Sequence, residues 1–394
     1  MKILQVANFY KPIWEAGGVA RSTYELSRHL AARNHAVTVY TTNWAYQDYD
    51  LATNAPVDVE GVRVYYFENL RRYAPSLLPP TPYYSPVVAR REIESFDIIH
   101  MNEYRALLTA GVSCYARKYD VPYVLQARGS LPKIMQVQRL KGVFDSIWGS
   151  RMLRDASRVI ALNPREVEQY QAMGVESDRI VTIPNGVDLS LFRNLPQPGR
   201  FREAFGIPED EQIILFLGRI NRIKGTDLLV DAFSDILRMG HSARLVIVGP
   251  DGGLLPALKQ QIADLGIADR ILFTGPLYET KDKLSAYIDA DVYVLPSIYE
   301  TFPNTVLEAN ACGTASILTD RCGIAEMIDG RGGVVVRYDR DELSSAIVDM
   351  LENDAGRRRF GENGREMVFS EFGWGSVVER MENLYTTVLE EWGS

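Results

Sequence analysis

The stretch that decides the fold is Ser297–Gly313, which reads S-I-Y-E-T-F-P-N-T-V-L-E-A-N-A-C-G. It follows the apolar run 291–295, D-V-Y-V-L, which is typical of a buried parallel strand. Pro303 stands where a first helical turn would begin, and Gly313 stands where that helix would end. The pattern therefore predicts a strand, a loop and a short helix.

This predicted unit has the chemistry of a phosphate and sugar site. The N–H groups of Asn304 and Thr305 fall at the helix start, where they lack helical partners and where the helix end favours an anion. Glu308, one turn further along, can accept hydrogen bonds from a ribose diol, and Glu300 in the loop can do the same for a sugar. The layout suits a nucleotide-diphosphate sugar. An ordinary βα unit with two surface acids is the alternative interpretation.

The two glutamates and the string A-N-A-C-G that follows them resemble a known signature. It is the E-x7-E motif of the retaining GT4-like glycosyltransferases, and its position directly after a strand makes the match more specific than the spacing alone. The resemblance implies the GT-B fold, an α/β architecture of two Rossmann-like, doubly wound parallel-sheet domains that face each other across a cleft.

A second glycine-bearing loop follows the predicted strand 212–217. It reads G-R-I-N-R-I-K-G over 218–225 and precedes a predicted helix from Thr226, a basic strand-to-helix loop that suits phosphate. It resembles the family loop whose arginine and lysine hold the donor diphosphate, which implies this role for Arg219 and Lys224. Two fixed cations would stabilise the departing diphosphate without a metal ion. A solvated basic turn is the alternative.

Two further donor contacts are implied by the resemblance. Gly17 and Gly18 follow the first predicted strand, 2–7, and would face the donor diphosphate; G-x-G-x-x-G is absent, so the dinucleotide fingerprint is not met. A plain βα turn is the alternative there. Leu277, in the string G-P-L-Y after the strand 271–274, would offer its backbone to the nucleobase.

The sequence departs from the family pattern at Arg128, in the string Q-A-R-G-S over 126–130. Many members have a histidine there, close to the transferred sugar, and an arginine cannot act as a base near neutral pH. Arg128 could instead bind a phosphate or a sugar oxygen. Glu103 and His100 are the remaining candidate bases of the first domain, and the sequence does not place them. In a retaining enzyme the leaving group can itself accept the proton.

The chain has 394 residues, which is too long for one ordinary core and favours two domains. The string P-N-G-V-D at 184–188 is a family mark near the end of the first domain, and the proline-bearing stretch 194–200 is typical of a linker. We therefore predict an acceptor-binding domain over 1–195, a donor-binding domain over 196–373, and a C-terminal helix, 374–394, that packs on the first domain.

Composition excludes several classes of protein. Charged residues make up 24% of the chain, as in a globular protein, and no run of eighteen apolar residues predicts a membrane span. The start of the chain predicts a strand rather than a signal peptide. Three scattered cysteines favour a reduced, cytoplasmic setting, and four unpaired histidines predict no zinc site. The D-A-D string at 289–291 begins a predicted buried strand, so no metal site is expected there either.

Charge is distributed unevenly along the chain. The net charge of −8 combines an excess of basic residues over 1–200 with a larger excess of acidic residues over the remainder, so the first half suits an anionic partner better. The segment 133–158 mixes basic and apolar residues; it is either a helix on an anionic lipid surface or a core helix with a solvated basic face. The long stretch 69–86 is either an acceptor- or membrane-facing loop or a packed excursion. No nucleic-acid module is visible.

Together these patterns predict a retaining glycosyltransferase of the hexosyltransferase class. The donor is expected to be a UDP- or GDP-linked sugar and the acceptor a glycan, a lipid-linked or a small molecule, as in cell-envelope glycan biosynthesis, without a metal or other cofactor. The expected setting is cytoplasmic, with peripheral contact to the inner face of the membrane as an option. An epimerase-like enzyme of the same fold and a non-catalytic sugar-nucleotide-binding protein remain as alternatives.

Overall fold

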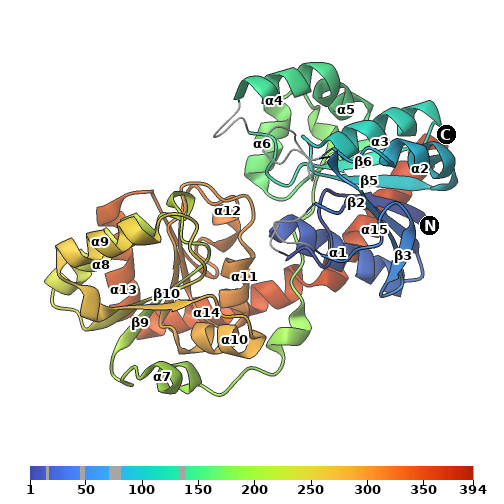
Figure 1. The fold of residues 1–394 in the computed structure, drawn as a ribbon. Coiled ribbons are helices and arrows are strands. Elements are labelled where there is room, and N and C mark those ends of the chain that lie inside the picture. Colours follow the sequence, from blue (N-terminus) through green and yellow to red (C-terminus); the bar gives the residue numbers. More distant parts are fainter. Residues whose placement is uncertain (15–16, 45–48, 71–80, 133–137, 394) are drawn as a thin grey trace. The chain divides into compact units, whose positions relative to one another are not determined.

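The computed structural model describes residues 1–14, 17–44, 49–70, 81–132 and 138–393. The chain divides into two compact units (Figure 1). Unit 1 comprises Met1–Gly186 and Trp374–Ser394, and unit 2 comprises Val187–Gly373.

Unit 1 is built on an eight-stranded sheet with the order β3-β4-β2-β1-β5-β6-β7-β8. Its strands are β1 (Lys2–Val6), β2 (Ala36–Thr42), β3 (Pro56–Val59), β4 (Val62–Phe67), β5 (Ile98–Asn102), β6 (Tyr123–Gln126), β7 (Arg158–Ala161) and β8 (Ile180–Thr182). All neighbouring pairs are parallel except β3 and β4, which are antiparallel. The order reverses between β1 and β5, so the loops after these two strands diverge at one edge of the sheet.

The antiparallel edge strand β3 was not predicted from the sequence. It forms a hairpin with β4 through Glu60 and Gly61, whose φ angles of 54° and 83° are typical of a two-residue hairpin turn. The alternation of valine and polar residues over 57–64 was the available signal. The first sheet is therefore parallel with one antiparallel edge strand.

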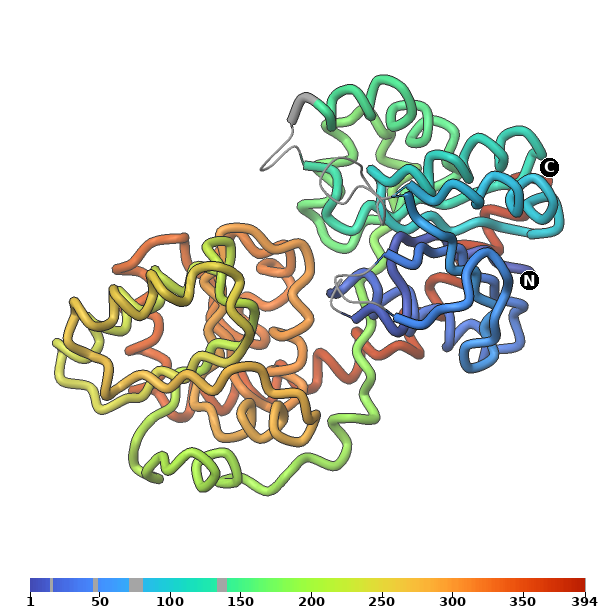
Figure 2. The backbone as a smooth tube through the Cα atoms, viewed as in Figure 1, coloured from blue at the N-terminus to red at the C-terminus, as the bar shows by residue number. Residues whose placement is uncertain are grey.

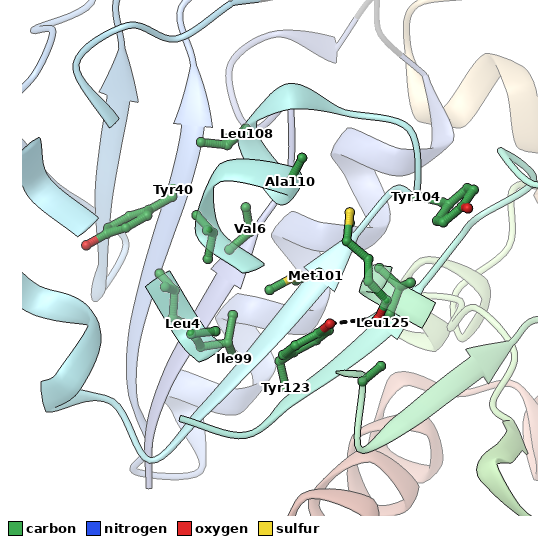
Figure 3. Close-up of a cluster of buried hydrophobic side chains, with 14 of the residues drawn as sticks. Leu4, Val6, Tyr40, Ile99, Met101, Tyr104, Leu108, Ala110, Tyr123 and Leu125 are labelled. Atoms are coloured by element: carbon green, nitrogen blue, oxygen red, sulfur yellow. Dashed lines mark hydrogen bonds between the residues drawn. The ribbon is translucent and has the colours of Figure 1, made fainter. Parts of the chain in front are cut away.

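Helices cover both faces of this sheet, as Figure 1 shows. They are α1 (Gly18–Ala32), α2 (Ser85–Glu92), η3 (Ile93–Ser95), α3 (Leu107–Lys118), α4 (Gln138–Phe144), the π-helical turn η4 (Asp145–Gly149), α5 (Ser150–Asp155), α6 (Pro164–Ala172), η5 (Ser177–Arg179) and α15 (Trp374–Trp392). Along β1, Ile3 belongs to one buried cluster and Leu4 to another, because successive side chains point to opposite faces. Figure 3 shows the cluster of Leu4, which includes Met101 and Leu125.

The C-terminal helix α15 belongs to unit 1. Trp374, Val378 and Tyr385 lie in the same buried cluster as Ile3, and Figure 2 shows the red end of the chain running among the blue segments of unit 1. Residues from the two ends of the chain thus complete one hydrophobic core.

Unit 2 contains a six-stranded sheet, parallel throughout, with the order β11-β10-β9-β12-β13-β14. Its strands are β9 (Gln212–Leu217), β10 (Ala243–Val248), β11 (Ile271–Gly275), β12 (Val292–Leu295), β13 (Ser316–Thr319) and β14 (Gly333–Val336). Its helices are η6 (Leu189–Phe192), α7 (Arg200–Phe205), η7 (Arg222–Lys224), α8 (Thr226–Arg238), α9 (Leu255–Leu265), η8 (Ala268–Arg270), α10 (Thr280–Asp289), α11 (Asn304–Ala311), α12 (Ala325–Ile328), α13 (Arg340–Glu352) and α14 (Asp354–Glu371). The order reverses between β9 and β12, the position where ligands bind in doubly wound sheets.

The division between the units falls earlier than the predicted boundary at 195. The N–H of Val187 donates to the carbonyl of Phe372 at 2.7 Å, and Val187 forms a parallel bridge with Gly373. Val187 is therefore held by the end of unit 2, because its backbone pairs there before the proline-bearing stretch begins.

In the ranges that the structure describes, no helix is long and apolar enough to cross a membrane.

Candidate functional site

The predicted strand, loop and helix around residue 300 are confirmed. Strand β12 is fully buried, and α11 begins at Asn304, directly after Pro303. The helix ends near Cys312, and Gly313 follows with a φ of 85°, a left-handed conformation that favours glycine. The loop between β12 and α11 lies at the reversal point of the second sheet.

The start of α11 offers free N–H groups. Val306 donates to the carbonyl of Pro303 at 3.1 Å, whereas the N–H groups of Asn304 and Thr305 contact no acceptor in the described chain. The hydroxyl of Tyr293 donates to Oγ1 of Thr305 at 2.8 Å, which fixes that side chain and leaves its amide open. Two adjacent open amides at a helix start can hold an anion.

Glu308 is held by two side chains of α10. Its Oε2 lies 3.0 Å from Nζ of Lys283 and accepts a hydrogen bond of 3.0 Å from the hydroxyl of Tyr287. The Glu308 side chain is 20% exposed, so it remains accessible to a ligand. Lys283 and Tyr287 were not predicted, since the sequence does not show which residues of α10 meet α11.

Glu300 and Lys224 form an ion pair, and both side chains are about one-fifth exposed. Lys224 ends the short helix η7, whose Ile223 carbonyl accepts a hydrogen bond of 2.7 Å from the N–H of Ile298. The loops that follow β9 and β12 are therefore joined through both backbone and side chains. The structure thus brings together two residues that the sequence placed 76 positions apart.

Arg219, on the same loop as Lys224, has a different environment. Its side chain is exposed and makes no hydrogen bond or ion pair with the residues that the structure describes. Gly252 lies against its stem: a Cβ atom at Gly252 would be 2.7 Å from Cγ of Arg219. The guanidinium is accordingly available to an anion.

Gly225 explains how the basic loop approaches β12. Its φ is 65°, and a Cβ atom there would lie 1.9 Å from the carbonyl oxygen of Pro296. Only glycine combines this conformation with this close approach.

Leu277 follows β11 and is half-buried. Within the described ranges its backbone N–H and C=O make no hydrogen bond, so both are available to a ligand. The neighbouring Tyr278 is 90% exposed.

In unit 1, Gly17 and Gly18 begin α1. Gly17 has a φ of 89°, which favours glycine, and a Cβ atom at either position would meet nothing within 4 Å among the residues that the structure describes. The backbone at this turn is therefore open on the side where a side chain would stand.

Arg128 is fixed by two asparagines. Its Nε donates to Oδ1 of Asn102 at 2.8 Å, and its Nη1 donates to Oδ1 of Asn185 at 2.7 Å. Burial lowers the pKa of Arg128 to about 10, and the carboxylates of Glu166 and Glu103 oppose that shift. Asn185 belongs to the P-N-G-V-D string, so part of that string positions Arg128.

The two remaining candidate bases of unit 1 differ in their environments. His100 is fully buried, and its Nδ1 lies 2.7 Å from the hydroxyl of Tyr385; burial lowers the pKa of His100 to about 3. Glu103 is partly exposed, and its Oε2 accepts a hydrogen bond of 3.0 Å from the N–H of Asn8. Burial raises the pKa of Glu103 to about 7, against the lowering effects of the Asn8 N–H and of Arg128.

The D-A-D string has a structural role. Asp289 accepts hydrogen bonds from the N–H groups of Gly199 and Phe201, at 2.6 and 2.7 Å, and so caps α7. Asp291 pairs with Arg202 and Arg357. In the portion of the chain that the structure covers, no group of three or more His, Cys, Asp or Glu side chains could hold a metal ion.

The basic segment of unit 1 has both a buried and an exposed side. Met152 and Leu153 are buried, whereas Leu140, Val143 and Ile147 are 66%, 53% and 55% exposed. Residues 133–137 of this segment lie outside the described residues. So do residues 71–80 of the long stretch that was predicted as either an acceptor- or membrane-facing loop or a packed excursion.

Solved structures share this architecture along the whole chain. Sucrose-phosphate synthase from Thermosynechococcus elongatus has a TM-score of 0.76 at 23% identity and covers 99% of this chain and 100% of its own. Anabaena HepE in complex with UDP and glucose has a TM-score of 0.75 at 19% identity and covers 98% and 100%. WaaG, a glycosyltransferase involved in lipopolysaccharide biosynthesis, has a TM-score of 0.70 at 19% identity and covers 98% and 99%. The fold is therefore GT-B, as predicted.

Sequence relatives define the family. Residues 16–191 match Glycosyltransferase Family 4, and residues 199–367 match Glycosyl transferases group 1. A D-inositol 3-phosphate glycosyltransferase of Geodermatophilus obscurus is 30% identical, over 96% of this chain and 86% of its own length. An uncharacterized glycosyltransferase of Methanocaldococcus jannaschii is 26% identical over the full length of both chains. The chain belongs to the GT4-like glycosyltransferase family.

Proposed function

We propose that this enzyme moves a hexose, with retention of configuration, from a nucleoside-diphosphate sugar to a hydroxyl group of an acceptor, without a metal ion. One observation carries the proposal. At the reversal point of the second sheet, an unpaired arginine, a lysine–glutamate pair and two open helix amides come from two loops that hydrogen-bond to each other. This set offers cations and N–H groups to a diphosphate, and it offers carboxylates to hydroxyl groups.

Each residue then has a defined role with the donor. Arg219 and the amides of Asn304 and Thr305 bind the diphosphate. Lys224 exchanges its contact with Glu300 for a phosphate oxygen, and Glu300 turns to the sugar hydroxyls. Lys224 gains an opposite charge and Glu300 gains hydrogen bonds from hydroxyl groups. The exchange therefore leaves neither group without a polar partner, and an unpartnered buried charge would cost several kcal/mol.

The remaining contacts select the nucleoside. Glu308 accepts hydrogen bonds from the ribose diol, the backbone of Leu277 meets the base, and Gly17 and Gly18 let the diphosphate approach the backbone of unit 1. Structures of Anabaena HepE, a neighbour at 18–19% identity, contain UDP or UDP-glucose. This favours uridine over guanosine as the base here.

The chemical step exchanges one bond to the anomeric carbon for another. The bond to the diphosphate oxygen breaks, the bond to the acceptor oxygen forms on the same face, and the acceptor proton passes to the departing diphosphate. Fixed cations beside the departing oxygens stabilise the charge that develops there, so a bound metal is not needed. Transfer rates that do not change in excess EDTA would support this part of the proposal.

The acceptor is proposed to carry an anionic group. Relatives of this chain are named D-inositol 3-phosphate glycosyltransferases, and the residues 1–200 carry excess basic charge. A lipid-linked acceptor is the second candidate, favoured by the exposed Leu140, Val143 and Ile147 with Arg151 and Arg154 close by in sequence. Co-sedimentation with anionic vesicles, lost in a Leu140→Ser/Ile147→Ser variant, would support that second candidate.

The test of the donor proposal is a calorimetric titration with UDP, GDP and ADP, followed by turnover. One nucleoside diphosphate should bind clearly, and the matching nucleotide hexose should be consumed with D-inositol 3-phosphate as the first acceptor tried. Conversion of the free nucleotide sugar without an acceptor would instead indicate an epimerase. Binding without any turnover would indicate a sugar-nucleotide-binding protein.

A further inference from the structure

Glu103 occupies the reversal point of the first sheet. The strand order changes direction between β1 and β5, and Glu103 directly follows β5. Asn8 follows β1 after one residue, and its N–H donates to Oε2 of Glu103 at 3.0 Å. In doubly wound sheets this edge is where ligands bind, since the loops that leave the two strands turn apart.

The backbone around Glu103 is unusual. Glu103 has a φ of 78° and Arg128, which follows the neighbouring strand β6, has a φ of 51°; neither is a glycine. Such conformations are strained for residues with a side chain, and they concentrate at functional sites. The N–H of Glu103 donates to the carbonyl of Gln126 at 2.8 Å, which holds the residue in place.

Unused hydrogen-bonding groups gather around this carboxylate. Only Oε2 of Glu103 is engaged, so Oε1 has no partner in the described ranges. Arg128 uses Nε and Nη1 and leaves Nη2 without a partner there. Asn8 is 8% exposed, and its buried Oδ1 also lacks a partner. Buried polar groups are normally paired, so the unpaired Oδ1 of Asn8, on the residue that also donates to the partly exposed Glu103, indicates a place for a polar ligand.

The other carboxylate near Arg128 already uses both of its oxygens. Glu166 is fully buried, and its two oxygens accept the N–H groups of Gly129 and Leu162, each at 2.7 Å. His100 is enclosed and contacts Tyr385. Of the acids that surround Arg128 in the described chain, Glu103 is the one with a free oxygen and an exposed surface.

We propose that Glu103 binds the attacking hydroxyl of the acceptor through Oε1. This role rests on the proposed transfer reaction and adds a catalytic residue to it. The carboxylate accepts the hydroxyl hydrogen and raises the nucleophilicity of the acceptor oxygen. The proton then passes to the departing diphosphate, so Glu103 ends the step unchanged. Arg128 is held by two asparagines and keeps a positive charge beside the carboxylate. Its Nη2 donates a hydrogen bond to a polar group of the acceptor.

Donor hydrolysis tests this role without knowledge of the natural acceptor, because water then takes the place of the hydroxyl. The probe is the tightest-binding nucleotide hexose from a panel of UDP-glucose, UDP-galactose and GDP-mannose. Glu103→Gln should lower the hydrolysis rate constant about 100-fold, the scale of a positioned acid–base group. Its affinity for the nucleoside diphosphate should stay within about twofold of the wild-type value, since unit 2 holds the donor. Glu94→Gln, an exposed acid of the same unit, is the matched control.

The outcomes separate this proposal from the donor proposal. Wild-type hydrolysis by Glu103→Gln would overturn the role of Glu103 and leave the proposed function standing. Loss of nucleotide binding in Glu103→Gln would also overturn it, because the residue would then act on the donor or on folding. If the wild-type protein binds no nucleoside diphosphate, the proposed function itself fails. Should Glu103→Gln fold poorly, partial restoration of the Glu103→Ala rate by added formate supports the role, and no restoration contradicts it.

Discussion

The substitution Glu308→Gln tests the donor site on unit 2 through a single atom. The Glu308 carboxylate contacts Lys283 and Tyr287 through Oε2, and Oε1 has no partner in the described ranges. We propose that a ribose diol donates two hydrogen bonds to this group. A hydrogen bond to a charged group contributes about 1.5–3 kcal/mol, and one to a neutral group about 0.5–1.5 kcal/mol.

The expected loss follows from these values. Glutamine keeps one carbonyl acceptor but loses the charge, so two charged hydrogen bonds are replaced by about one neutral bond. The ion pair between Glu308 and Lys283 is part-exposed and contributes about 1 kcal/mol or less. Its loss in the variant therefore changes the expected loss of affinity only a little. Two charged bonds of about 1.5–3 kcal/mol each, less one neutral bond of about 0.5–1.5 kcal/mol, leave a net loss of about 1.5–5.5 kcal/mol, which corresponds to an affinity at least about 10-fold weaker.

The assay is calorimetric titration of UDP at 25 °C and constant salt. Glu362→Gln on α14 changes an exposed carboxylate of the same unit and serves as the control. Lys283→Gln should change the affinity less than Glu308→Gln does, since it frees the carboxylate for the ribose. An unchanged UDP affinity in Glu308→Gln, with normal folding, would refute the assignment of Glu308 to the ribose.

Three further predictions follow from the described contacts. Arg219→Ala should lower kcat/KM about 100- to 1,000-fold, which steady-state kinetics would measure. The free energy of unfolding, measured by thermal melting, should change little, because the Arg219 side chain is exposed and has no partner in the described ranges. Gly225→Ala should destabilise unit 2 by more than about 2 kcal/mol, because the new Cβ would lie 1.9 Å from the carbonyl oxygen of Pro296. An unchanged denaturant midpoint would show that the close contact between residue 225 and Pro296 is not required for stability. Burial raises the pKa of Glu103 to about 7, so the folded protein holds a proton that the unfolded chain releases near pH 4.5. The stability that this group contributes therefore falls as the pH rises between these two values, by at most about 3 kcal/mol. Glu103→Gln should remove this part of the pH dependence in melting curves measured from pH 5 to 8.

Much of the fold could be predicted because strand and helix patterns are local. The run 212–217 and the strand β9 coincide, and the apolar run 291–295 differs from β12 only by its first residue. The first predicted strand, 2–7, likewise extends one residue beyond β1.

The parts of the candidate sites that could not be predicted depend on packing between elements. Lys283 and Tyr287 reach Glu308 from another helix, and no local pattern shows how α10 and α11 face each other. Asn185 reaches Arg128 across 57 residues. The exposure of Leu140 and Ile147 likewise depends on which face of the segment the core covers.

Loops that follow strands were easier to place. In a parallel sheet the carboxyl ends of the strands share one edge, so residues after β9 and β12 were expected to meet. Lys224 and Glu300 do so. What the pattern did not show is that these opposite charges pair with each other.

Retention during transfer is the central claim of the proposed mechanism, and proton NMR of the product tests it most directly. The enzyme would be incubated with the best-binding α-linked nucleotide hexose and an acceptor that it accepts, with D-inositol 3-phosphate as the first choice. The coupling constant of the anomeric proton would be measured in the first product formed. We predict an α-linked product, and a β-linked product would contradict the account.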